Sequence, residues 1–281
     1  MTVTRDASRI AEAAHLSPTE FARSIRRLVL EESKRANVGH IGSALSIADI
    51  LAALYGTAVL RDGAGQSGER DRFILSKGHA ALALYAALHL QGCLSREQLA
   101  TYCRDDSLLG VHPDRALPGV DFTTGALGHG LSYGAGAALA GRMLGSDRRV
   151  FVLMSDAECN EGSVWEAAMF AAHHQLSNLV AIIDANGQQA LGYTSEVLDL
   201  EPLAARWKAF GWEVEELPGH DVEVLAARFD SLPAPTGQPH VVVARTVFGR
   251  GVSYMEGQIK WHYLPMSEAE YEQALREVAE G

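Results

Sequence analysis

Residues 150–154 read VFVLM and residues 179–183 read LVAII, and these two apolar runs decide the fold. The first run ends at Ser155-Asp156, the second is followed by Asn186, and a helix-like pattern from 163 to 174 separates them. Two short runs rich in β-branched residues around a helix-length segment indicate a βαβ unit with parallel strands. A parallel crossover brings both carboxyl ends to one edge of the sheet, where open α/β sheets bind ligands.

We therefore expect Asp156 and Asn186 to lie close together at that edge. One offers a carboxylate and the other an amide oxygen, with no thiol or imidazole between them. Hard oxygen donors suit Mg²⁺ or Ca²⁺, and Mg²⁺ uses few protein ligands because phosphate and water complete its shell. A plainer interpretation stays open, in which Asp156 caps a helix and Asn186-Gly187 forms an ordinary turn.

Composition excludes several classes of partner. The chain has 281 residues and a net charge of −11, from 35 acidic and 24 basic residues, with no basic cluster. Binding to nucleic acid or to an anionic membrane is therefore not expected. Three cysteines (Cys93, Cys103 and Cys159) show no metal-ligand spacing, which is typical of a reducing compartment. With no apolar stretch of transmembrane length and no secretory leader, we expect a cytoplasmic protein.

Strand and helix patterns alternate along the rest of the chain. This alternation predicts a three-layer αβα architecture with one doubly wound, mostly parallel sheet between about 20 and 265. We expect a single domain over 1–281, with residues 1–16 as a loosely held arm. Further strands are expected at 71–76, 212–217 (at an edge) and 240–246, and helices at 17–37, 46–55, 80–90, 95–103, 131–144, 203–211, 222–231 and from 267.

Glycines and histidines gather at the predicted loops. Gly39-His40-x-Gly42 could let the backbone approach a ligand closely. Three glycines within residues 125–130 precede a helix, and they either present amides to an anion or serve tight packing. A single Gly-His pair is more often a packed histidine than a catalytic one. No dinucleotide fingerprint and no P-loop is present in the sequence.

Jointly, these motifs are more specific than any one of them. The chain resembles, from about Ile25 to Pro265, the N-terminal, diphosphate-binding half of transketolase in its split, two-polypeptide form. The motifs that carry the resemblance are Ala36-Asn37-x-Gly39-His40-x-Gly42, Asp71-Arg72-Phe73-x-Leu75-Ser76-Lys77-Gly78-His79, His112-Pro113 before Leu117-Pro118-Gly119-Val120, Thr123-Thr124-Gly125-x-Leu127-Gly128-x-Gly130, Glu161-Gly162, Trp165-Glu166-Ala167, Asp184-x-Asn186-Gly187 and Lys260-Trp261-His262.

The resemblance implies that the chain binds thiamine diphosphate through Mg²⁺ (or Ca²⁺). Its metal ligands would be Asp156, Asn186 and the main-chain carbonyl of Gln188. Residues expected to face the cofactor are Gly125 and Leu127 on the aminopyrimidine side, and His79, Ala157 and Glu158 at the diphosphate. The catalytic histidines would be His40 and His112 facing the donor ketose, His262 in the substrate channel, and His79. Glu161 would join a network that links two cofactor sites across a dimer.

The implied reaction is transfer of a two-carbon ketol unit from a ketose, often a sugar phosphate, to an aldose, as a transketolase-type glycolaldehyde transferase. In this family the glutamate that activates the cofactor belongs to a second, pyrimidine-binding domain. We therefore expect activity only with a separate C-terminal subunit, in a heterotetramer. Two alternatives stay open: a related enzyme for an unusual sugar phosphate, a sulfonated sugar or an acyl donor, and a degenerate assembly subunit without the cofactor.

Two departures from the family pattern bear on the site. The family signature begins Gly-Asp-Gly, whereas this chain has Ser155-Asp156-Ala157. If the backbone of Ala157 had a positive φ, its methyl group would cost about 1 kcal/mol or more. His129 replaces the usual glutamine, as a proton donor near the cofactor or as another packed histidine.

Overall fold

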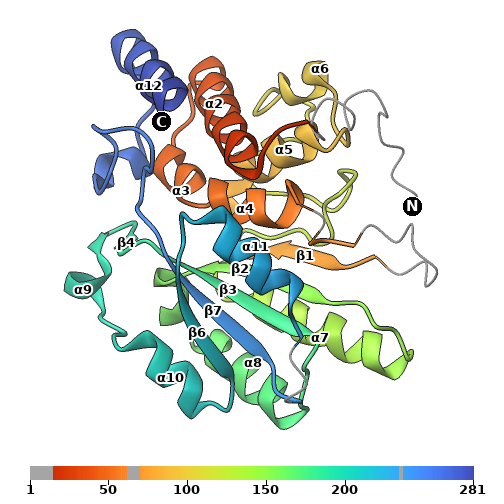
Figure 1. The fold of residues 1–281 in the computed structure, drawn as a ribbon. Coiled ribbons are helices and arrows are strands. Elements are labelled where there is room, and N and C mark those ends of the chain that lie inside the picture. Colours follow the sequence, from red (N-terminus) through yellow and green to blue (C-terminus); the bar gives the residue numbers. More distant parts are fainter. Residues whose placement is uncertain (1–14, 58, 62–69, 234–236) are drawn as a thin grey trace.

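The central sheet is parallel throughout, and its order follows from the crossovers (Figure 1). The computed structural model describes residues 15–57, 59–61, 70–233 and 237–281. Within these ranges the strands pair in the order β1 (Arg72–Leu75), β2 (Val150–Ser155), β3 (Leu179–Ala185), β7 (His240–Arg245) and β6 (Glu213–Pro218). Every pair is parallel. The predicted α/β architecture is confirmed, and β6 is an edge strand as expected.

The two apolar runs that open the sequence argument are neighbouring strands. β2 pairs with β3 in a register that sets Ser155 opposite Asp184, and α8 (Gly162–His173) connects them. All residues of both strands are buried. A parallel strand covered on both faces is apolar without alternation, which explains the continuous runs. The predicted βαβ unit is confirmed.

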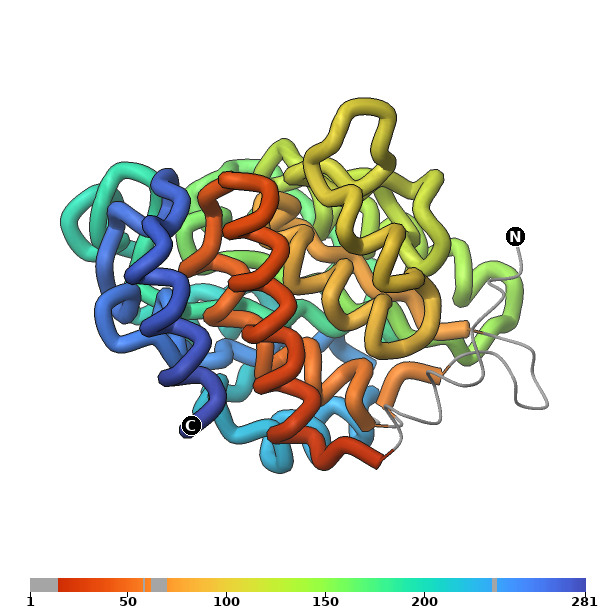
Figure 2. Tube along the Cα trace, turned by 90° about the horizontal axis from the view of Figure 1, so that it is seen from above, coloured from red at the N-terminus to blue at the C-terminus, as the bar shows by residue number. Residues whose placement is uncertain are grey.

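Helices cover both faces of the sheet (Figure 1). One face packs against α7 (Gly130–Met143), α8 and α10 (Leu203–Ala209). The opposite face packs against α2 (Pro18–Ala36), α4 (Ala48–Tyr55), α5 (Ala81–Leu90) and α11 (Val222–Asp230). Along β2, Val150, Val152 and Met154 enter the first core, and Phe151 and Leu153 the second, because side chains of a strand alternate between its faces. α12 (Glu268–Glu280) lies beside α2 (Figure 2).

Local signals set most helix ends. Ser17 and Glu20 form a capping box at the start of α2, as its sequence predicts. The helix expected over 46–55 is confirmed as α4, which begins at Ala48, but the short helix α3 (Ile41–Ser46) before it was not predicted. One predicted helix was wrong in extent. The helix expected over 95–103 is only α6 (Arg96–Leu99), and the chain then turns through Cys103, whose φ is 55°.

Short elements after the strands were not expected from the sequence. They include a hairpin of β4 (Gln188–Gln189) and β5 (Gly192–Tyr193), α9 (Thr194–Val197) and the 3₁₀ turns η1 (Gly78–Ala80), η2 (Ala157–Asn160) and η3 (Ile259–His262). Most of the predicted arm, residues 1–14, lies outside the described residues, as do residues 234–236. Within the described part, no helix is both long and apolar enough to cross a membrane.

Candidate active site

A cleft of about 270 Å³ opens at the carboxyl end of the sheet. The segments that follow β1, β2, β3 and β7 all contribute to its walls, as expected for an open parallel sheet. Nine of the residues expected to act at the site line it, whereas Asp156, Glu158 and His112 do not. The nine are His40, His79, Gly125, Leu127, Ala157, Glu161, Asn186, Gln188 and His262. Residues spread over more than 200 positions are thus brought together by the crossovers.

Asp156 and Asn186 converge, as the βαβ unit predicts. The Oδ2 atom of Asp156 accepts a hydrogen bond from the amide of Gly187 at 2.8 Å. The other carboxylate oxygen accepts from the amide of Ala157 at 2.8 Å, so Asp156 also caps η2. Asn186 Oδ1 accepts from the amide of Gln188 at 2.9 Å, as in an Asx turn. The cap and the turn of the plainer interpretation are therefore present, and the Gly187 bond ties Asp156 to the loop that carries Asn186.

Asp184 fixes which atom of the Asn186 amide is available to a ligand. Asn186 Nδ2 donates to Asp184 Oδ2 at 2.7 Å. A carboxylate only accepts hydrogen bonds, so the amide nitrogen must face it and the amide oxygen must point elsewhere. Asp184 itself is fully buried at the end of β3. Asn186 is thus held with its oxygen turned away from Asp184, where it accepts from the Gln188 amide and keeps a second lone pair for a ligand.

A buried ion pair at this point was not assigned any role from the sequence. Lys77, which follows β1, is fully buried and donates through Nζ to Asp184. Ser46 and Thr246 also donate to that carboxylate, and their hydrogen bonds together with Lys77 hold the pKa of Asp184 low despite its burial. The sequence shows Lys77 and Asp184 at strand ends, but their 107-residue separation hides the pairing.

The charge on Asp156 is not neutralised in the same way. Burial raises the pKa of this carboxyl from its ordinary value to about 7, and the nearby charge of Asp184 contributes to that rise. A divalent cation would supply the missing positive charge. No group of three or more His, Cys, Asp or Glu side chains suited to a metal occurs within the described ranges. One carboxylate with an amide and a main-chain oxygen suits Mg²⁺, which takes few protein ligands.

Three imidazoles form one wall of the cleft. The ring centroids of His40, His79 and His262 lie 5.2–5.6 Å apart. Burial and the neighbouring cationic groups lower the pKa of His262 to about 4 and the pKa of His79 well below its usual value. The pKa of His40 is also lowered, mainly by burial. All three rings are therefore neutral near pH 7, and each can both donate and accept a hydrogen bond.

The positions on either side of His40 require glycine for a different reason from the one expected. A Cβ atom on Gly39 would lie 2.3 Å from the carbonyl oxygen of Tyr263, and one on Gly42 would lie 2.1 Å from the ring of Phe248. Both glycines therefore admit other parts of this chain rather than a ligand. His40 has a φ of 61°, and its amide donates to the His262 carbonyl at 3.3 Å. This packing places the His40 ring against the wall of the cleft.

The glycine-rich segment before α7 mainly serves packing. The amide of Gly128 donates to Glu158 Oε1 at 2.7 Å, and the amide of Gly130 donates to Ser76 Oγ at 3.1 Å. A Cβ on Gly130 would lie 2.1 Å from that Ser76 oxygen. Ser76 also donates to Glu158, which is fully buried. The anion at the Gly128 amide is thus a protein carboxylate, and the Glu158 side chain does not line the cleft.

The departures from the family signature cause no backbone strain. Ala157 starts η2 and is not among the described residues with positive φ, so its methyl group is tolerated and lines the cleft. Ser155 Oγ accepts from the amide of Glu158 at 3.0 Å. His129 is exposed, lies 6.2 Å from the ring of Tyr133, and does not line the cleft. The structure therefore places His129 as a surface neighbour of an aromatic ring.

His112 does not line the cleft, and its ring lies beside Gly125, which does. A Cβ on Gly125 would touch the His112 ring at 3.2 Å, and Tyr85 anchors the His112 carbonyl at 2.9 Å. The His112 residue is exposed, unlike His40, His79 and His262.

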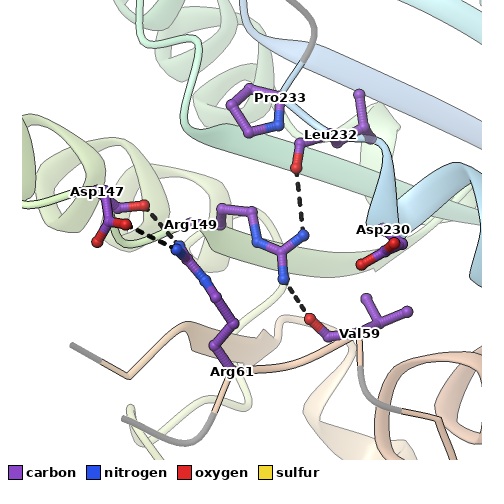
Figure 3. Close-up of a pocket in the computed structure, with 7 residues that line it drawn as sticks. All are labelled: Val59, Arg61, Asp147, Arg149, Asp230, Leu232 and Pro233. Atoms are coloured by element: carbon purple, nitrogen blue, oxygen red, sulfur yellow. Dashed lines mark hydrogen bonds and ion pairs between the residues drawn. The ribbon is translucent and has the colours of Figure 1, made fainter. Parts of the chain in front are cut away.

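A larger cavity, of about 410 Å³, lies at the opposite end of the strands (Figure 3). Arg149 donates to Asp71 and to the carbonyls of Val59 and Leu232. Arg61 bonds Asp71 and Asp147. The guanidinium groups are thus occupied by the protein itself, and this cavity is a structural junction at the strand starts.

The architecture and the cleft define a class of α/β enzyme found among solved structures. The chain superimposes on transketolase from Leishmania mexicana with a TM-score of 0.86 and 30% identity, covering 94% of this chain and 41% of that one. Transketolase from Campylobacter jejuni gives a TM-score of 0.86, with 93% and 42% covered. The chain thus spans about two fifths of these proteins.

The chain belongs to the transketolase family. Residues 17–279 match the family profile described as transketolase, thiamine diphosphate binding domain. It is 44% identical to one of the subunits of the apulose-4-phosphate transketolase of Phocaeicola vulgatus, over 91% of both chains. It is 40% identical to the 6-deoxy-6-sulfo-D-fructose transketolase subunit SqwG of a Clostridium species, over 92% of this chain and 94% of that one. The expected family, its transferase class and a thiamine diphosphate-binding domain are confirmed.

Proposed function

We propose that this chain is the cofactor-binding subunit of a Mg²⁺- and thiamine diphosphate-dependent transketolase, which transfers a two-carbon ketol unit between sugars. The observation that carries the proposal is the juxtaposition of Asp156 and the Asn186 loop, joined by the 2.8 Å bond to Gly187. Asp156, the Asn186 side chain and the Gln188 main-chain carbonyl would hold the metal. The bound cofactor would supply the electron sink for cleaving the donor ketose.

The side chains of this chain would bind and orient the donor. Neutral imidazoles at His40, His79 and His262 can exchange protons with hydroxyl and carbonyl oxygens without attracting a counter-ion. His112, whose ring lies beside Gly125, would meet the same substrate. Glu161, which is exposed and lines the cleft, would extend the hydrogen-bonding network toward a second cofactor site.

A separate C-terminal subunit is part of this proposal. Two segments that contribute residues to the cleft, 188–198 and 259–264, also carry large apolar side chains that are 36–80% exposed: Leu191, Tyr193, Val197, Leu198, Ile259, Tyr263 and Leu264. Their two segments are joined there, because Tyr263 donates to the Ala190 carbonyl and Tyr193 to the Gly257 carbonyl. Apolar surface of this kind favours association with another protein. We propose a heterotetramer in the cytoplasm, in which this chain forms a single domain.

The proposal extends to which sugar serves as the donor. The two relatives named above are transketolase subunits whose names specify apulose 4-phosphate and 6-deoxy-6-sulfo-D-fructose. Their names favour an unusual sugar as donor over the common pentose phosphates. A panel containing these two compounds, D-xylulose 5-phosphate and D-fructose 6-phosphate would distinguish the possibilities when turnover is measured.

Calorimetry with Mg²⁺ and thiamine diphosphate tests the proposal directly. The chain, mixed with a purified C-terminal transketolase subunit, should bind the cofactor and transfer ketol units, while the chain alone should not turn over. Asp156→Asn should remove metal-dependent binding, whereas the exposed Asp230→Asn should not. No cofactor binding by either the chain or the mixture would instead favour a degenerate assembly subunit.

A further inference from the structure

Gln188 carries a buried carboxamide that has no hydrogen-bond partner among the described residues. Only 5% of the residue is exposed, and it lines the cleft from the short strand β4. Neither its Nε2 nor its Oε1 atom is paired within that part of the chain. A buried donor and acceptor are rarely left unpaired, because each loses its bonds to water. An orphaned amide at the wall of a binding cleft therefore points to a ligand.

Two further unpaired atoms in the same cleft narrow the chemistry of that ligand. The buried Nδ1 atoms of His40 and His262 also lack partners within the described ranges, and both residues line the cleft. A carboxamide offers a donor and an acceptor, and a neutral imidazole offers one of each. A phosphate or carboxylate only accepts, so it would leave Gln188 Oε1 unpaired. A hydroxyl group both donates and accepts, and a polyol can satisfy several such groups at once.

The carboxamide can turn toward a ligand without breaking a hydrogen bond to the described residues. It has no hydrogen bond to the described residues to give up, so rotation of its side chain breaks none of them. The wall near Nε2 is Gly257, where even an added methyl group would lie 4.0 Å away. β4 is held in a hairpin by just two residue pairs, Gln188 with Tyr193 and Gln189 with Gly192. The side chain therefore sits on a short hairpin and has no hydrogen bond within the described residues to lose.

We propose that the Gln188 carboxamide binds a hydroxyl group of the donor sugar and helps to determine which sugar is accepted. This inference rests on the proposed ketol transfer and extends it to a side chain whose only other role would be a main-chain one at the metal. The side chain and the carbonyl act separately. Substituting the side chain therefore leaves the metal ligand in place.

The test uses Gln188→Met, which keeps the length and removes both polar atoms, in the complex with the C-terminal subunit, Mg²⁺ and thiamine diphosphate. The KM for D-fructose 6-phosphate should rise about three- to tenfold, as for the loss of one neutral hydrogen bond. The cofactor Kd from calorimetry should not rise, and the thermal midpoint should not fall. Gln273→Met on α12, outside the cleft, is the matched control, and Gln188→Leu is the second variant if the first does not fold.

Monodeoxy analogues of D-fructose 6-phosphate, used as competitive inhibitors, identify the hydroxyl. Wild type should bind at least one analogue several-fold more weakly than the parent sugar, and Gln188→Met should not distinguish that analogue from the parent. An unchanged KM in both Gln188 variants, or a weakened cofactor Kd with an unchanged KM, would overturn the inference. Failure of the wild-type complex to bind cofactor would instead overturn the proposed function, so the two failures are distinguishable.

Discussion

Asp156→Asn should change stability and metal binding in opposite directions. The carboxyl is buried between β2 and the loop after β3, and its pKa is raised to about 7 from an ordinary value of 3.8. The folded state therefore holds its proton more tightly than the unfolded state does. The stability that this group provides is present below pH 4 and is lost as the pH rises through 7. Asp156→Asn cannot ionise, so the stability of the variant should not fall in this way as the pH rises.

The magnitude follows from the pKa values. Each pKa unit corresponds to about 1.4 kcal/mol, so the ionised carboxylate costs about 4 kcal/mol above pH 7. Asparagine has one oxygen where Asp156 has two, and both of those accept backbone amides, from Ala157 and Gly187. One amide would then face an NH₂ group, at a cost of about 1–3 kcal/mol. We expect the variant to be more stable than wild type by about 1–3 kcal/mol at pH 8.

Urea denaturation from pH 5 to pH 8, in the presence of a chelator, measures the free energy of unfolding of both the Asp156→Asn variant and wild type. The free-energy difference between variant and wild type should shift by about 2–3 kcal/mol over that range. The lowered pKa of His262 has the opposite effect on the free energy of unfolding, because the stability that this group provides is lost as the pH falls below 6.5. This effect is the same in both proteins, so it cancels in the difference between variant and wild type. Mg²⁺ with thiamine diphosphate should then stabilise wild type alone. Parallel pH profiles for the two proteins would refute the reasoning.

Three further outcomes are expected. Lys77→Met should destabilise the fold by about 3–5 kcal/mol in chemical denaturation, because it leaves a buried carboxylate without its cation; a loss below about 1 kcal/mol would contradict this. Gly42→Ala should lower the free energy of unfolding by about 1–3 kcal/mol, because the added methyl group displaces the Phe248 ring. Gly136→Ala in α7, where a Cβ would meet nothing within 4 Å, should raise it by up to about 1 kcal/mol. Equal effects of the two substitutions would count against the packing argument. In a ¹⁵N NMR titration the His262 ring should stay neutral down to about pH 5, and protonation near 6.5 would show that it is not desolvated.

Local patterns in the sequence were sufficient to predict the sheet. The unbroken apolar runs of β2 and β3 follow from burial on both faces, and their parallel pairing follows from one helix-length crossover. The convergence of Asp156 with the Asn186 loop is a direct consequence of that topology. Where a turn competes with a helical pattern the prediction failed, as at α6, because propensity does not fix where a short helix ends.

The chemistry of the cleft was less accessible to sequence reasoning. Gly39 and Gly42 mark close approaches in the sequence, but what approaches them is Tyr263 and Phe248, more than 200 residues away. Such contacts depend on tertiary packing, which one sequence does not encode in any local signal. The orphaned amide of Gln188 was equally invisible, since an unpaired atom is defined by what surrounds it. The resemblance supplied the roles of residues, and the structure supplies the reasons for their positions.

Asp184 has the central place in this arrangement, although it does not line the cleft. Its carboxylate receives hydrogen bonds from Lys77 after β1, Ser46 of α3, Thr246 after β7 and the Asn186 side chain. One buried group thus joins four segments at the carboxyl end of the sheet and orients the oxygen that would meet the metal. Because a buried carboxylate is tolerated only when it is fully paired, each of these segments is held in place by the same requirement. The positions of the residues around the cleft therefore depend on the Asp184 carboxylate, which does not itself line the cleft.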